Sequence, residues 1–174
     1  MSSKQVLKTT PTPVTSASEL NDTKVRRVQG TVLALALRPT KGQTVDLQDG
    51  LELSPKQGVI GDHGTSKKRQ VTFLDKAAWQ TACEEVGVEI EWTKRRSNVL
   101  VSGLDLPKLV GSEIRVGSAL VEVIGEVFPC HNMDAVQQGL KLALKPQWRG
   151  GVYGRVVDEG EVTVGDQITI HSSQ

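Results

Sequence analysis

The stretch Gly125-Glu-Val-Phe-Pro-Cys-His-Asn-Met-Asp-Ala-Val-Gln-Gln-Gly139 decides how the chain is organised. Apolar and polar residues alternate before its corner, as in a strand, and apolar residues recur at helical spacing after it. Pro129 cannot donate a hydrogen bond to a sheet and biases Phe128 towards an extended backbone, so we expect a sharp corner here. Asn132 is a favourable N-cap residue, which predicts a helix from Met133 to Leu144.

The same stretch places Cys130 just ahead of the predicted helix, where unpaired backbone N–H groups favour negative charge. A thiol in such a place has a larger share of thiolate, the form that attacks electrophiles and binds metals. The alternative is a small buried apolar side chain that happens to precede a helix. His131 is adjacent, but neighbouring side chains of an extended chain point apart, so it need not act as a base for the thiol.

Short apolar segments separated by glycine, proline or aspartate recur along the rest of the chain. Asp49-Gly50 and Gly117-Ser118 each predict a hairpin between two such segments. A helix is predicted from Leu74 onwards, with Gly87 as its C-terminal stop. About eight or nine short strands with two short helices predict a mainly β fold, a closed or partly closed β-barrel. The segments with a strand-like pattern are 24–37, 45–47, 51–53, 71–74, 99–101, 113–116, 119–127, 152–157, 161–164 and 167–170.

Composition sets the broad class. Of the 174 residues, the Ser/Thr/Pro-rich segment 1–23 is expected to be a disordered leader, and 24–174 to form one β-barrel domain. A net charge of +1 does not indicate a nucleic-acid binder. No apolar run approaches the ~18 residues of a membrane span, and the N-terminus lacks the apolar core of a signal peptide. The two cysteines make no disulfide framework, which favours a cytoplasmic location.

Basic residues stand beside loop–strand junctions in three places: Lys67-Lys68-Arg69, Lys94-Arg95-Arg96 and Arg149-Gly150-Gly151. Glycine lets a backbone approach a ligand closely, and arginine presents a fork suited to phosphate or carboxylate. We therefore expect Arg95, Arg96 and Arg149 to form an anion-binding rim around Cys130. The alternative is three solvated charge runs, which we favour for Lys67 and Lys68.

The loop around Gly61 holds two further candidates, Asp62 and His63, which can orient a ligand or a water molecule. Asp62 can equally cap its own turn. The chain has three histidines, and its cysteines lack a paired ligand spacing, so a zinc site is not expected.

Taken together, these motifs resemble MOSC domains, which form the C-terminal part of molybdenum cofactor sulfurases and also occur as stand-alone bacterial proteins. The resemblance covers residues 28–170. It is carried by a series of segments in the family's order: Gly61-Asp62-His63, Arg69-Gln-Val-Thr72, Arg95-Arg-Ser-Asn-Val-Leu-Val-Ser-Gly-Leu-Asp-Leu106, Pro129-Cys130, Arg149-Gly-Gly-Val-Tyr-Gly-Arg155 and Val164-Gly-Asp166.

The resemblance implies a β-barrel whose single cysteine, here Cys130, carries sulfur or ligates molybdenum. It also implies binding of the molybdenum cofactor (molybdopterin) through basic and glycine residues. The matching positions are Arg95, Arg96, Asn98, Arg149, Gly150 and Gly151, with Asp62 and His63 beside them. Some members reduce N-hydroxylated substrates, and others transfer sulfur beside a desulfurase domain that holds pyridoxal phosphate. That domain is not expected here, and neither is pyridoxal phosphate in this chain alone.

Three hypotheses follow for the function. The first is a molybdenum-dependent reductase of small N-hydroxylated substrates, with Cys130 ligating the metal. Because no cysteine cluster for an iron–sulfur centre is present, its electrons would come from a separate protein. The second is a non-catalytic sulfur carrier that receives sulfur from a donor protein and passes a Cys130 persulfide to a partner. The third is a plain ligand-binding barrel with an inert cysteine. Nucleic acid and membrane are not expected as partners.

Overall fold

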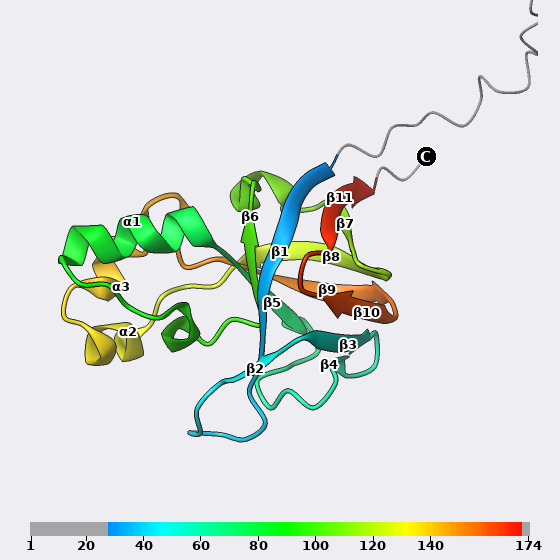
Figure 1. The fold of residues 1–174 in the computed structure, drawn as a ribbon, viewed down its shortest axis with the longest axis horizontal. Helices are drawn as coiled ribbons and strands as arrows, with labels where there is room; N and C mark the ends of the chain where they lie inside the picture. The colour runs from blue at the N-terminus through cyan, green and yellow to red at the C-terminus, as the bar shows by residue number, and fades with distance from the viewer. Residues whose placement is uncertain (1–27, 172–174) are drawn as a thin grey trace, which may run out of the picture.

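The structure is a computed structural model, and it describes residues 28–171. The predicted leader 1–23 and the predicted start of the first strand lie outside these residues. Within them the fold is mainly β, with three short α-helices and three 3-10 turns (Figure 1). The strands are β1 (Val28–Leu37), β2 (Asp46–Gln48), β3 (Gly50–Ser54), β4 (Gly58–Val59), β5 (Val71–Asp75), β6 (Val99–Ser102), β7 (Glu113–Val116), β8 (Ala119–Glu126), β9 (Val152–Asp158), β10 (Gly160–Thr163) and β11 (Gln167–His171). The helices are α1 (Lys76–Val86), α2 (His131–Val136) and α3 (Leu140–Ala143), and the 3-10 turns are η1 (Trp92–Arg95), η2 (Leu106–Leu109) and η3 (Pro146–Trp148).

Seven strands close into a barrel in the order β11-β7-β8-β9-β5-β6-β1, and β1 pairs back onto β11. β2 pairs with β1 but is not part of the ring, and β10, β3 and β4 form a small second sheet. β5 and β6 pair in parallel because α1 and η1 lie between them in the chain, whereas the other ring pairings are antiparallel. The predicted mainly β barrel is confirmed.

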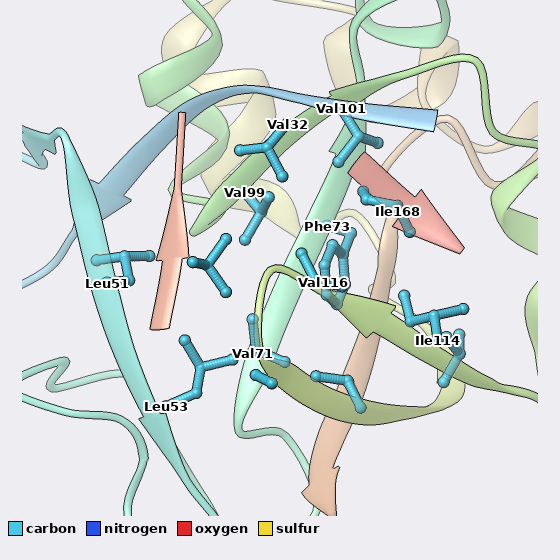
Figure 2. Packing of buried hydrophobic residues seen from close by; sticks show 14 of the residues in the cluster. Val32, Leu51, Leu53, Val71, Phe73, Val99, Val101, Ile114, Val116 and Ile168 are labelled. Atoms are coloured by element: carbon cyan, nitrogen blue, oxygen red, sulfur yellow. The ribbon is translucent and has the colours of Figure 1, made fainter. Parts of the chain in front are cut away.

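The barrel interior is filled by branched apolar side chains. Figure 2 shows Val71, Phe73, Val99 and Val101 pointing inwards from β5 and β6. Because side chains alternate along a strand, Leu74, which follows Phe73, and Leu100, which lies between Val99 and Val101, point outwards and pack against the helices. These two strands are thus covered on both faces, which explains their nearly continuous apolar sequence.

The three α-helices gather on one side of the barrel, as Figure 1 shows. α1 begins where Asp75 accepts a hydrogen bond from Ala78 N at 2.8 Å, and it ends at Gly87, whose backbone is left-handed (φ 72°). The predicted stop at Gly87 is confirmed, and so is the predicted hairpin around Gly117-Ser118, which joins β7 to β8. None of the helices in the described region is long and apolar enough to cross a membrane.

Two local predictions were wrong. The segments around Asp49-Gly50 do not form a hairpin: β2 pairs with β1 of the barrel, whereas β3 pairs with β10 and β4 of the second sheet. The single helix expected from Met133 to Leu144 is two helices, because Gln137 has an extended backbone and Gly139 is left-handed (φ 88°). The first of them starts at His131, with Cys130 rather than Asn132 as its N-cap residue.

Candidate functional site

The corner between β8 and α2 presents Cys130 to solvent. Val127 and Pro129 are buried there, while Phe128 and Cys130 are exposed. Side chains two residues apart in an extended chain lie on the same face, so this alternation turns the thiol outwards. Cys130 itself has an extended backbone, and its carbonyl oxygen accepts from Met133 N at 3.0 Å. The other cysteine, Cys83, is buried on α1 as expected, and burial raises the pKa of its thiol.

Arg95, at the end of η1, holds this corner in place. Its side chain is buried, and its Nε donates to Gly150 O at 2.9 Å while its Nη2 donates to Val127 O at 2.8 Å. Val127 belongs to the segment that leads to the thiol. Within residues 28–171, Nη1 of Arg95 makes no hydrogen bond and its guanidinium is in no ion pair with a carboxylate. Among the described residues Arg95 is therefore a buried cation without a carboxylate in direct contact, although the charge of Glu126 acts on it from further away.

A second arginine, Arg69, lies close enough to Arg95 and Cys130 for its charge to interact with theirs. The pKa of Arg95 is lowered to about 10, first by burial and then by the positive charge of Arg69, whereas the charges of Cys130 and Glu126 act in the opposite direction. Partial burial of its side chain lowers the pKa of Arg69, and the positive charge of Arg38 lowers it further. Arg69 as a whole residue is nevertheless exposed. Asp62, Cys130 and Tyr153 raise it. We call Cys130, Arg95 and Arg69 the thiol site.

The sequence predicted that Arg95 and Cys130 lie together, and the structure brings them together. Arg69 was not among the predicted site residues, although it opens the segment Arg69-Gln-Val-Thr72 on which the family resemblance rests in part. Its neighbour Lys68 and the preceding Lys67 are exposed. The signal that could have found Arg69 is its position just ahead of the buried strand β5, with Gln70 between them.

The glycine pair Gly150-Gly151 serves the packing of the loop. A Cβ at Gly150 would lie 2.9 Å from Val127 O and 3.0 Å from Arg95 Nη2. At Gly151 the backbone is left-handed (φ 94°), and a Cβ would collide with Phe73 O. The absence of side chains thus lets the loop approach β5 and Arg95 closely. Both glycines are buried.

Behind the thiol site lies a buried polar network centred on Asp62. Arg38 donates to Asp62 from Nε at 3.1 and 3.0 Å and from Nη2 at 2.8 Å. Gly64 N donates to Asp62 at 2.6 Å, and Asn98 Nδ2 donates at 2.7 Å. Asn98 is fully buried, and Thr72 donates to its Oδ1 from both N and Oγ1. The polar atoms of Asp62 and Asn98 are therefore engaged within the protein.

The other candidate residues make no side-chain hydrogen bond or ion pair with Cys130, Arg95 or Arg69 within residues 28–171. His63 is exposed, and so is His131 at the start of α2. Arg96 has a left-handed backbone and donates from Nη1 to Gln43 O at 3.2 Å. Arg149 donates from Nη1 to Glu85 Oε1 on α1 at 2.7 Å and to Ala143 O at 3.0 Å. The structure thus ties Arg149 to the helices by an ion pair.

The described part of the chain offers no group of three or more His, Cys, Asp or Glu side chains arranged to hold a metal ion. A metal at the thiol site would need ligands other than protein side chains, with Cys130 as the one soft donor. The chemistry of the site is that of an exposed sulfur beside two guanidinium groups, which suits a ligand that is anionic and carries its own metal-binding atoms.

Comparison with known proteins decides the family. The sequence model of the MOSC domain matches residues 60–169, which is most of the chain. The chain belongs to the MOSC domain family. The match includes Arg69, Arg95 and Cys130, so the whole thiol site of this MOSC protein lies within the family's region. No curated protein matches the chain at the level of its sequence.

Solved structures share the MOSC barrel. The YUAD protein from Bacillus subtilis is 25% identical, with a TM-score of 0.67 over 83% of this chain and 97% of that one. YiiM from Geobacillus stearothermophilus is 18% identical, with a TM-score of 0.65 over 82% of this chain and 75% of that one. YiiM from Escherichia coli is 17% identical, with a TM-score of 0.60 over 84% of this chain and 70% of that one. The two YiiM structures support the fold alone.

Proposed function

We propose that this MOSC protein binds the molybdenum cofactor at the thiol site and reduces small N-hydroxylated substrates there. The observation that supports this most is the proximity of the exposed Cys130 to a buried Arg95 that makes no direct ion pair within residues 28–171. A thiolate is a soft ligand suited to molybdenum, and guanidinium groups suit the phosphate of a pterin cofactor. When bound, the cofactor supplies a metal centre that exchanges electrons with a nitrogen–oxygen bond.

The residues around the thiol divide into two roles. Arg95 and Arg69 bind the anionic tail of the cofactor, Arg95 from inside the corner and Arg69 from the exposed edge. Arg38, Asp62 and Asn98 form the buried frame behind them and make no contact with the ligand, because their polar groups already bond one another. This assignment moves the tail contact from Arg149, which pairs with Glu85, to Arg69.

The second candidate is a sulfur carrier. Within residues 28–171 the other thiol, Cys83, is buried on α1, so a persulfide on Cys130 has no accessible neighbouring thiol with which to form an intramolecular disulfide. Such a persulfide would persist until a partner protein takes the sulfur. The carrier hypothesis predicts a persulfide mass on Cys130 in protein free of molybdenum.

The experiment is to express wild type and Cys130→Ser in a host that makes the cofactor and to measure molybdenum, pterin and the mass of each cysteine peptide. Reduction of an amidoxime is then assayed with reduced methyl viologen as electron source. We expect wild type to carry pterin and molybdenum and to reduce the substrate. Cys130→Ser should keep pterin, because the arginines remain, but lose activity.

Two results separate the candidates. A wild-type protein with a Cys130 persulfide and no pterin would replace the reductase by the carrier. A wild-type protein with neither pterin nor persulfide, or a Cys130→Ser variant with undiminished activity, would overturn both.

A further inference from the structure

A groove of about 810 Å³ lies along α1, away from the thiol site. One wall is α1 and the other is the segment 87–92 that follows it. The indole Nε1 of Trp79 donates to Ile90 O at 2.8 Å and so ties the two walls together. This bond fixes the width of the groove, which we call the α1 groove.

The floor of the α1 groove is apolar. Trp79, Cys83 and Leu100 line it and are buried, and Trp92 adds a half-buried ring. The indole N–H of Trp79 is already used within the protein, so its ring offers only apolar surface. Val88, at 43% exposed, lies at the open edge. The floor can therefore take up apolar side chains from water.

The rim of the α1 groove is acidic. Glu84, Glu89 and Glu91 line it, are exposed, and take part in no ion pair among residues 28–171. Lys76 is the one basic residue among those that line it. Three negative charges and one positive charge give the rim a net charge of −2, whereas the whole chain is at +1. This concentration of negative charge selects a positively charged occupant.

We propose that the α1 groove docks a basic, amphipathic segment of a partner protein. Apolar side chains of that segment cover the floor, and its lysines or arginines face the three glutamates. The acidic rim repels nucleic acid and anionic lipid. The inference does not rest on the proposed cofactor, because the α1 groove and the thiol site are lined by different residues.

The fold connects the two places. η1 (Trp92–Arg95) begins with Trp92 at the α1 groove and ends with Arg95 at the thiol site. A partner seated in the groove therefore contacts the same short element that positions the cation beside Cys130.

The test uses a synthetic 14-residue peptide of leucine and lysine in an amphipathic helical pattern, titrated against the full chain by calorimetry. The matched negative probe has every lysine replaced by glutamate. We expect the lysine peptide to bind and the glutamate peptide not to bind. Tryptophan fluorescence gives a second readout, because Trp79 and Trp92 line the groove.

Two double variants remove the same charge from different places. Glu89→Gln with Glu91→Gln removes two charges from the rim, and Glu159→Gln with Glu161→Gln removes two exposed glutamates at the β9–β10 turn and the start of β10. We expect the rim variant to weaken binding about fivefold to twentyfold and the turn variant to leave it unchanged. Circular dichroism confirms that both remain folded.

A second comparison tests the apolar contribution. It sets Val88→Ser at the groove against Val164→Ser, because Val164 is similarly exposed but lies near β10. We expect weaker binding for the first alone. Equal losses in the two double variants, or equal binding of the glutamate peptide, would overturn the proposal in favour of non-specific attraction. A concentration-dependent dimer that the rim variant abolishes would overturn it in favour of a second copy of this chain.

Discussion

Two buried arginines of this barrel are held in opposite ways. Arg38 is 5% exposed and bonds the carboxylate of Asp62, whose side chain is fully buried. Arg95 is 8% exposed, but its partners are the carbonyl oxygens of Val127 and Gly150. The Arg38 charge is in direct contact with a carboxylate, whereas the Arg95 charge has no such contact in the part of the chain that the structure describes. We infer that Arg38 belongs to the frame of the barrel, whereas the charge of Arg95 is available for the anion that we propose to bind beside Cys130.

The largest expected effect comes from breaking the neutralised pair. Asp62→Ala leaves the Arg38 guanidinium buried without a carboxylate and also removes the acceptor for Gly64 N and Asn98 Nδ2. We expect the free energy of unfolding to fall by about 3–5 kcal/mol, measured by urea denaturation.

The control is Glu122→Ala, which removes the partner of Arg155 in an exposed ion pair. That change should cost at most about 1 kcal/mol. A similar fall in the free energy of unfolding for the two variants would show that the buried Arg38–Asp62 pair stabilises the fold no more than an exposed ion pair does.

A smaller effect is expected at the second arginine. Arg95→Gln leaves Val127 O and Gly150 O without their donors but also removes a buried charge that has no carboxylate in direct contact within residues 28–171. The two consequences oppose each other, so we expect a loss of about 2 kcal/mol in the same assay. A loss as large as that of Asp62→Ala would mean that Arg95 has a neutralising partner and that the comparison fails.

The smallest effect is expected for the arginine tied to the helices. Arg149→Gln breaks the pair with Glu85, whose side chain is 48% exposed, and the bond to Ala143 O. Because water screens such a pair, thermal unfolding should show a loss of about 0–1 kcal/mol. A much larger loss would assign Arg149 to the core of the fold.

Period-2 patterns made most of the barrel predictable from the sequence. The segments 71–74 and 99–101 were expected as strands because their apolar residues form short runs between turn residues, and they form β5 and β6. Gly87 was expected to end α1 because glycine adopts the left-handed backbone that such an end requires. These features depend on neighbours in the chain, which is the information that a sequence pattern contains.

Features that depend on distant partners were not predictable in the same way. Asp49-Gly50 has the composition of a hairpin turn, but β3 finds a better partner in β10, more than a hundred residues later. Arg149 was expected to bind a ligand because two glycines follow it. Its partner in the structure is Glu85, which lies 64 residues earlier in the chain. The charges of Arg69 and Cys130 likewise interact only because β5 and β8 both pair with β9.

The central claim is that the anion at the thiol site is bound by Arg69 and Arg95, while Arg149 plays no part in binding it. The most direct measurement is the pterin and molybdenum content of Arg69→Gln and Arg149→Gln, purified side by side with wild type from a host that makes the cofactor. Each variant loses one positive charge, so the total charge of the two is matched. We predict that Arg69→Gln binds the cofactor about tenfold more weakly or worse and loses most of its load, while Arg149→Gln keeps a full load. A full load in Arg69→Gln, or its loss in Arg149→Gln, would contradict the claim.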